Sequence, residues 1–334
     1  MTLDWWIEIV VKIVVVFLVV LTSVAYLTLL ERRVIALMQS RIGPNRVGPQ
    51  GLLQPAADAL KLMTKEQVIP TSADRILFMI APVFSLVPAL MAYSVIPFGD
   101  SITIFGREVA LQVSDVNVAV LIILALSSIG VYGIFLGAWA SNNKYSLVGG
   151  LRSSAQMISY ELTLGLVVVA VVLLAGSFSL RDIVLAQSKL PFVLLQPVGF
   201  ALFLVAALAE INRTPFDLPE AESELVAGYH TEYSGMRFAM YFLGEYANVI
   251  TVSAMAVLLF LGGWLVPWPS PAWMSPLWFT AKVLLVIFFM IWTRGTLPRF
   301  RFDQLMLFGW KVLLPVALAN IVVTGLVVAL LDRA

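Results

Sequence analysis

Apolar runs of about 20 residues, long enough to cross a bilayer as α-helices, recur along the whole chain. The chain is 60% hydrophobic and only 12% charged over its 334 residues, whereas soluble domains are roughly a quarter charged. Lipid offers no hydrogen-bond partner to the backbone, so each run is expected to be helical. The sequence therefore predicts an all-α, polytopic transmembrane helix bundle forming a single membrane domain, residues 1–334.

The runs predict about eight spanning helices, each long enough for a hydrocarbon layer of roughly 30 Å. They are expected at residues 7–30, 76–97, 116–140, 157–176, 190–210, 238–265, 276–293 and 311–331. The N-terminus opens with Asp4 and Glu8 instead of a basic segment, and the first run is too long for a signal peptide. It is therefore interpreted as a membrane helix.

Lysine and arginine are divided unevenly between the two sets of loops. Fifteen lie in the loops at 31–75, 141–156, 211–237 and 294–311, and four lie in the loops on the other side. Because Lys- and Arg-rich loops remain on the cytoplasmic or matrix side, both termini are expected on the outer side.

Composition excludes several functions. The chain has no cysteine and a single histidine, His230, so it cannot ligate an iron–sulfur cluster, and no metal site is expected. No GxxxxGK[ST] loop for nucleotide phosphates is present. The net charge of +1 gives no field that would attract nucleic acid. Any redox centre must therefore lie on a partner.

Two long loops carry unusual patterns. A helix is expected from Gln50 to Glu66, with one apolar face suited to the membrane interface; it could be a simple anchor. Loop 211–237, together with Glu210, carries six acidic residues against two arginines. A short helix between Pro219 and Gly228 would place Glu220 and Glu224 on one face. A solvated loop is the alternative, but the interleaved apolar and aromatic residues argue against it.

Three carboxylates fall within the apolar runs, in the cytoplasmic half of the bundle: Glu161, Glu210 and Glu245. A carboxylate is costly in lipid, so each is expected to face the protein interior or water. One such residue could simply hydrogen-bond across helices. Three at similar depth, leading to an acidic loop, favour a proton path. His230 could relay protons as well, although a structural role is preferred.

At the two loops the sequence closely resembles the H-subunit family of bacterial NADH–quinone oxidoreductase, the counterpart of subunit 1 in mitochondrial complex I. The resemblance is carried by ordered blocks from residue 31 to about residue 315. They are ERR at 31–33, QSRIGPNRVG at 39–48, DALKLMTKE at 58–66, SNNKYS at 141–146, SYE at 159–161, EINRTPFDLPEAESELVAGYHTEYSG at 210–235, GEY at 244–246 and PRFRFDQLM at 298–306.

The resemblance implies roles for particular residues. In that family loops 31–75 and 211–237 would form part of a quinone chamber, shared with a peripheral subunit. Positions along the quinone tunnel match Glu31, Arg32, Arg33 and Arg294. Positions of a proton path match Asp58, Glu161, Glu210, Glu220, Glu222, Glu224 and Glu245. Some members carry a further glutamate in the third helix; none lies between Val116 and Ala140 here.

The resemblance also implies the setting of the chain. It would be a subunit of a proton-translocating enzyme in the bacterial plasma (inner) membrane, inactive alone; the mitochondrial inner membrane is less favoured. Quinone would be its substrate, and nothing would be bound covalently. Iron–sulfur clusters and flavin would lie on partner subunits. The partners would be peripheral iron–sulfur and quinone-site subunits, small membrane subunits, antiporter-like subunits and lipid, with no nucleic acid.

Three alternatives differ in their expectations. A related subunit of a hydrogenase- or ferredoxin-linked complex would keep the carboxylates and could lack a quinone tunnel. A stand-alone cation transporter would work as a purified chain, but the internal repeat of many transporters is absent from the sequence. A purely structural anchor would tolerate glutamine at the membrane glutamates.

The orientation can be tested with single introduced cysteines, since the native chain has none. Because of the uneven basic charge, cysteines at positions 50 and 220 should be shielded from an impermeant thiol reagent added outside intact cells. They should react only after the membrane is opened. Labelling of either position in intact cells would contradict the expected topology.

Overall fold

The computed structural model describes residues 3–104, 107–217, 226–266, 268 and 271–331. In this part of the chain, seven helical segments are long and apolar enough to cross a membrane: Trp6–Met38, Arg75–Ser94, Ala119–Ala140, Lys144–Ala175, Gly235–Phe260, Ala272–Thr296 and Phe302–Leu330. The all-α polytopic fold is confirmed. The main helices are α1 (Leu3–Met38), α3 (Arg75–Met91), α4 (Ala119–Ala140), α5 (Lys144–Ala175), α10 (Gly235–Phe260), α11 (Ser275–Thr296) and α13 (Leu314–Leu331).

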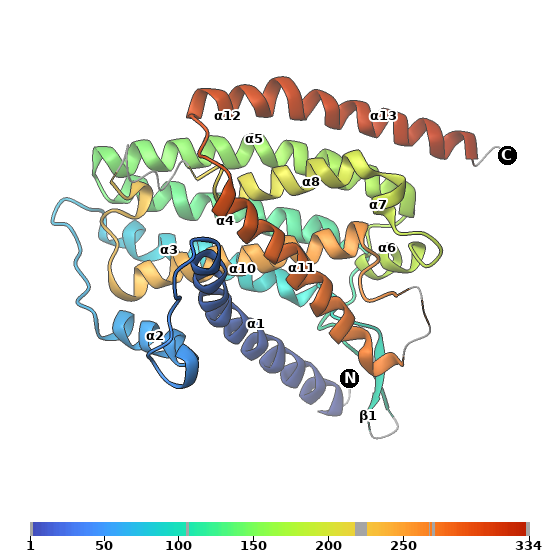
Figure 1. Ribbon diagram of the computed structural model, residues 1–334, viewed down its shortest axis with the longest axis horizontal. Helices are drawn as coiled ribbons and strands as arrows, with labels where there is room; N and C mark the ends of the chain where they lie inside the picture. Colours follow the sequence, from blue (N-terminus) through green and yellow to red (C-terminus); the bar gives the residue numbers. More distant parts are fainter. Residues whose placement is uncertain (1–2, 105–106, 218–225, 267, 269–270, 332–334) are drawn as a thin grey trace.

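Helix α10 lies at the centre of the bundle. It packs against α3, α11 and α1, while α5 packs against α4, α13 and α8 (Pro197–Glu210). In the most apolar part of α10, 72% of residues are buried, compared with 17% in the segment that contains α13. Figure 1 shows α13 along the upper edge beside α5. Most of the surface of α13 is therefore free to contact lipid or other chains.

The helix ends differ from the predicted ones in ways that matter for the site. Helix α1 continues to Met38 instead of ending at residue 30, so residues 31–33 are helical. Helix α5 begins at Lys144, and most of the predicted loop 141–156 belongs to it. With 32 residues, α5 is about 48 Å long, well beyond the hydrocarbon layer.

The helix predicted at 190–210 is divided into α7 (Phe192–Leu195) and α8, which meet at Gln196. Helix α8 has 14 residues and is about 21 Å long. Pro197 begins α8, and its ring cannot donate a backbone hydrogen bond. The side-chain amide of Gln196 donates to Thr324 Oγ1 at 2.8 Å and to the Ala170 carbonyl at 3.3 Å. At the junction of α7 and α8, the side-chain amide of Gln196 is therefore hydrogen-bonded to protein atoms.

The last membrane segment is built from three pieces. They are α12 (Phe302–Phe308), the π-helical η5 (Gly309–Leu313) and α13. Side chains of α5 hold this segment: the Tyr160 hydroxyl donates to the Leu305 carbonyl at 2.9 Å, and Ser159 Oγ accepts from the Trp310 indole at 3.3 Å.

The expected interfacial helix of the first long loop is α2 (Gln54–Thr64), preceded by the 3₁₀ turn η1 (Pro49–Gly51). Gly51 has a φ of 77°, and a Cβ there would lie 2.3 Å from the Pro44 carbonyl oxygen. Only glycine fits this turn without displacement. The turn returns the chain towards α1 and places α2 beside the end of that helix.

Short elements complete the described chain: η2 (Ala92–Ser94), α6 (Leu180–Ala186), η3 (Gly228–His230) and η4 (Ala272–Met274). A hairpin of β1 (Ser101–Ile104) and β2 (Arg107–Ala110), which pairs Ser101 with Ala110, was not predicted. It lies near the start of α11, since Ser275 Oγ accepts from the Asp100 amide at 3.1 Å.

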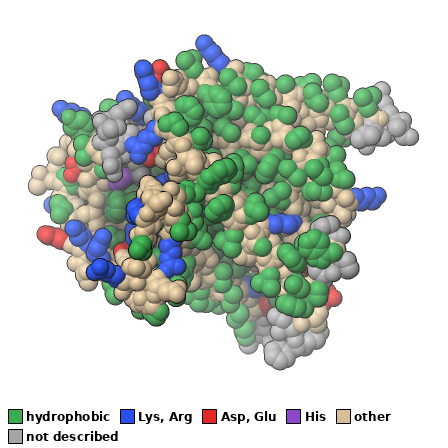
Figure 2. Space-filling model, in the orientation of Figure 1, with side chains coloured by type: hydrophobic (Ala, Val, Ile, Leu, Met, Phe, Trp, Pro, Cys, Tyr) green, Lys and Arg blue, Asp and Glu red, His purple; other side chains and the backbone are tan. Residues whose placement is uncertain are grey.

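The surface is polarised along the helices. Figure 1 places both chain ends at the side of the molecule away from α2. In Figure 2 most Lys and Arg side chains of the visible face gather at the end that carries α2, and hydrophobic side chains cover most of the remainder. Basic side chains are therefore concentrated at one end of the helices, as their uneven distribution among the loops predicts.

Candidate functional site

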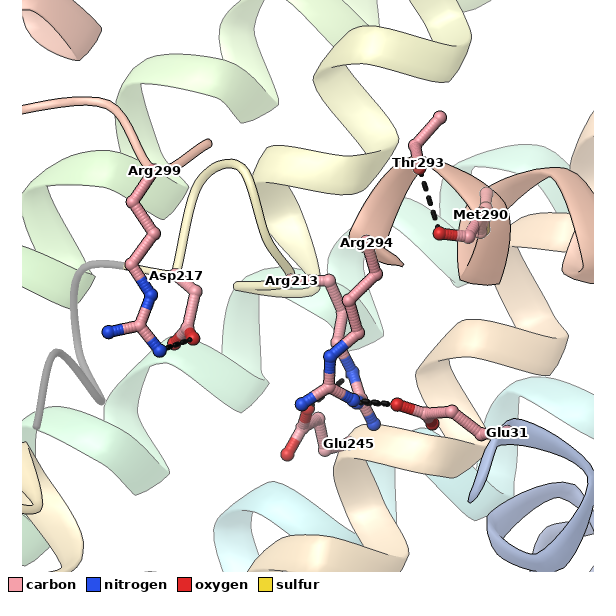
Figure 3. Close-up of polar contacts among 8 residues, drawn as sticks. All are labelled: Glu31, Arg213, Asp217, Glu245, Met290, Thr293, Arg294 and Arg299. Carbon is pink, nitrogen blue, oxygen red and sulfur yellow. Dashed lines mark hydrogen bonds and ion pairs between the residues drawn. The ribbon is translucent and has the colours of Figure 1, made fainter. Parts of the chain in front are cut away.

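Four charged side chains from four segments meet between α1, α10 and α11. Glu31 is on α1, Arg213 follows α8, Glu245 is on α10 and Arg294 is in the last turn of α11. Arg213 lies 3.0 Å from a Glu31 oxygen and 2.7 Å from a Glu245 oxygen, and Arg294 also pairs with Glu31 (Figure 3). Two carboxylates therefore face two guanidinium groups. Such balance is needed to hold charge inside a membrane.

The fold of the chain after α8 places Arg213 in this cluster. The Arg213 amide donates to the Leu208 carbonyl at 3.2 Å and forms a tight turn. The buried Gln156 amide on α5 holds this turn by donating to the carbonyls of Ala209 and Phe216 at 2.8 and 2.7 Å. The Arg213 guanidinium also lies 4.4 Å from the centre of the Tyr246 ring, a favourable cation–π contact.

Sequence reasoning counted Arg213 only as a counter-charge in an acidic loop and missed it as a site residue. One signal was available: Arg213 is a single cation that follows an apolar helix ending in Glu210, three residues before Phe216. Its side chain is only 10% exposed, and those of Glu31 and Glu245 are 7% and 16% exposed.

Small cavities adjoin the cluster. One of about 20 Å³ is lined by Glu31, Arg213 and Arg294 together with apolar side chains. Another of about 40 Å³ is lined by both Glu210 and Glu245, with Tyr229 and Tyr241. Small cavities with charged side chains in their walls therefore lie both at the end of α1 and at the end of α8.

Glu161 occupies a different face from Glu245. It lines an open groove of about 590 Å³ whose other walls are Leu124, Ile158, Leu162, Gly165, Leu166, Leu314 and Leu318. Ser128 Oγ on α4 hydrogen-bonds to the Glu161 carboxylate. The neighbouring Ser127 lies beside Glu210, and the carboxylates of Glu161 and Glu210 are close enough to repel each other. Two neighbouring serines on α4 thus contact these carboxylates, one serine each.

Arg32 and Arg33 do not join the Glu31 cluster. Arg32 pairs with Asp58 on α2 at 2.8 Å, and the Gln54 amide donates to the same carboxylate at 3.0 Å. Arg33 donates to the Gln50 carbonyl. Because the Arg32 side chain is 54% exposed, this pair adds little stability. Its geometric effect is to hold α2 against the end of α1.

A further ion pair joins the loop that follows α8 to the loop that follows α11. Arg299 lies 2.9 Å from Asp217 (Figure 3). The Phe300 amide donates to the Pro215 carbonyl at 3.1 Å. The rings of Phe216 and Phe300 stack with centres 5.7 Å apart. Asp217 was not predicted as a site residue. The predicted residues Glu220, Glu222 and Glu224 lie outside the described part of the chain.

An aromatic cluster surrounds His230, outside the membrane-spanning segments. The ring centres of Tyr229 and Phe238 lie 4.9 and 5.3 Å from that of His230. Burial lowers the pKa of His230 to about 4 and raises the pKa of Tyr233 to about 12. Both side chains are therefore neutral near pH 7, which for His230 favours the structural interpretation over a relay.

The described residues contain no group of three or more His, Cys, Asp or Glu side chains that could hold a metal ion. The apolar helices of the protein surround buried ion pairs and small cavities. This arrangement defines the protein as a polytopic membrane protein with a charged interior.

Residues 11–325 match the family model described as NADH dehydrogenase, and the chain belongs to this family. It is 57% identical to the NADH-quinone oxidoreductase H-subunit 1 of Geobacter metallireducens over 96% of both chains. It is also 57% identical to the H-subunit 2 of Geobacter sulfurreducens over 94% of both chains, and to the H-subunit of Thermomicrobium roseum over 92% of both chains. The resemblance noted in the sequence is confirmed.

The buried state of His230 predicts a pH-dependent stability. The unfolded chain takes up a proton near pH 6.5 and the folded chain only near pH 4, so stability is complete above pH 6.5 and is lost as the pH falls towards 4. The difference corresponds to about 3 kcal/mol. Thermal unfolding of the detergent-solubilised protein between pH 7.5 and 5 should show about 2 kcal/mol of this loss, and His230→Gln should reduce it. Equal slopes in both proteins would contradict the assignment.

Proposed function

We propose that this chain is the membrane subunit of a proton-pumping NADH–quinone oxidoreductase that forms a wall of the quinone tunnel and the first part of a proton path. The relatives' names and the family support the enzyme class. Iron–sulfur clusters and flavin would lie on partner subunits, since this chain has no cysteine. The complex would lie in a bacterial plasma membrane with both termini of this chain outside.

One observation carries the coupling role: Arg213 contacts Glu31, a tunnel residue by resemblance, and Glu245, a membrane carboxylate. Quinone reduction consumes two protons and changes the charge beside Glu31 and Arg294. A change of charge on Glu31 alters the balance around Arg213 and hence the proton affinity of Glu245. Glu210 shares a cavity with Glu245 and lies close to Glu161. The order Glu31, Arg213, Glu245, Glu210, Glu161 is therefore the proposed sequence of coupled groups.

The remaining tunnel residues, and the charged residues of the two long loops, have distinct roles in this proposal. Arg294 lines the small cavity with Glu31 and sets the potential and hydration there. Arg32, Arg33 and Asp58 position α2, and with it the loop 31–75 as a wall of the chamber. Asp217 and Arg299 hold the loop after α11 against loop 211–237, the second wall. The acidic residues Glu220, Glu222 and Glu224 complete the chamber in the proposal, on the strength of the resemblance alone.

Replacing the tunnel arginine tests the quinone role. Arg294→Met should reduce quinone reduction by the assembled complex about tenfold, which corresponds to 1.4 kcal/mol in the barrier. Electron transfer from the donor to an artificial acceptor should be nearly unchanged, because that reaction does not use the tunnel. Arg301→Met is the matched control, since the Arg301 side chain is 76% exposed and pairs only with Asp303 among the described residues. Equal loss of both activities in Arg294→Met would leave the tunnel role unsupported.

Replacing the membrane glutamates tests the proton path. Glutamine keeps the size and hydrogen bonding of glutamate but cannot ionise. Glu161→Gln and Glu245→Gln should each lower coupled proton pumping and quinone reduction in vesicles about tenfold, with assembly intact on native gels. The double variant should be little worse than the worse single one, because groups in one chain of transfer are not additive.

Glu8→Gln is the control for this series, because Glu8 lies at the outer end of α1 and pairs with Lys12 at 2.7 Å. A purely structural role predicts mild effects, since a neutral amide removes a costly buried charge. Near-normal pumping in both single variants and in the double variant would remove these glutamates from the mechanism.

A further inference from the structure

Two adjoining cavities lie in the interior between α3, α4, α8 and α10. Each has a volume of about 40 Å³. Six residues line both of them: Ser85, Gly130, Met157, Glu210, Ile211 and Asn248. One cavity also reaches Glu245, and the other reaches Ser127 and Thr251. Because they share these walls, the two cavities adjoin each other around Glu210.

Polar atoms in this space lack protein partners. Ser85 Oγ and Glu210 Oε2 are buried and have no hydrogen-bond partner among the described residues. The half-buried Asn248 side chain lines both cavities as well. Buried polar groups without partners cost roughly 1–3 kcal/mol each, and proteins normally satisfy them. Two such atoms, on α3 and α8, together with the Asn248 amide on α10, point to a polar occupant.

Water is the occupant that fits the volume. A buried water needs roughly 10–15 Å³ of cavity measured in this way and two to four polar partners. We infer that Ser85, Glu210 and Asn248 bind ordered water in these cavities, and that Asn248 is a positioning residue that orients this water between Glu245 and Glu210. The inference rests on the proposed function, in which these two carboxylates exchange protons.

The helical spacing on α10 supports this role. Glu245, Asn248 and Thr251 follow one another at intervals of three residues, so they lie along one face of the helix. A side-chain amide can donate and accept hydrogen bonds at once. Asn248 can therefore accept a hydrogen bond from one water while it donates to another, whichever carboxylate carries the proton.

Gly130 supplies the room for this water. It lines both cavities, and a Cβ placed on it would meet no atom within 4 Å. A larger side chain there would enter the cavity without changing any polar group. Gly325 on α13 also has open space around its Cβ but lies outside both cavities. The two glycines form a matched pair for a test.

The experiment uses the intact complex reconstituted in vesicles, with pumping and quinone reduction measured in H₂O and D₂O. Asn248→Val and Gly130→Val should each lower the coupled rate about tenfold and increase the solvent isotope effect, because proton transfer becomes rate-limiting. Asn248→Ser, which keeps a hydroxyl and leaves space for water, should restore most of the rate. The controls Asn320→Val and Gly325→Val, at two membrane positions outside both cavities, should match the native complex.

Normal rates in Asn248→Val and Gly130→Val, with Glu245→Gln impaired, would overturn this inference and leave the proposed function standing. A lower rate with an unchanged isotope effect would also overturn it, because a general structural defect acts in that way. Normal pumping in Glu245→Gln would instead remove the proposed function itself. If the valine at position 130 prevents assembly, Gly130→Ala gives the same comparison with a smaller intrusion.

Discussion

The position of the Arg213 guanidinium between Glu31 and Glu245 is the interaction on which the interior of this protein depends. A carboxylate inside a membrane bundle is tolerated only when a counter-charge or hydrogen bonds replace its hydration. Removing one partner from such a buried set would cost about 3–5 kcal/mol. The cluster therefore restrains α1, α10 and α11 relative to one another, because each supplies one of its charges.

The same cluster gives the proposed coupling a physical basis. Arg213 interacts with two carboxylates at once, so a change of charge at one alters the balance at the other. The small cavities beyond it keep Glu210 and Glu245 in one polar space. Glu161 lies farther away, on the wall of an open groove, beside a pair of serines on α4. On α4 the side chains nearest to these carboxylates are thus neutral hydroxyl groups.

Several site residues were predictable and others were not. The membrane glutamates were found because a charge in an apolar run is conspicuous. The helix α2 was predicted from its single apolar face. Arg213 and Asp217 were missed because each follows the end of an apolar run, where a charge is unremarkable. The division of α7 from α8 and the extension of α1 through residues 31–33 were also missed, since helix ends depend on neighbours that hydrogen-bond the free backbone groups.

The sequence by itself determined the class of fold, the approximate spans and the side on which basic residues gather, because the bilayer imposes length and polarity on each segment separately. The tertiary structure alone decided which faces of the helices meet. Lipid and bundle interior are both apolar, so the pattern of a membrane helix says little about which face is buried. Glu31, Arg213, Glu245 and Arg294 are spread over more than 260 residues, and only the packing of α1, α10 and α11 brings them into contact.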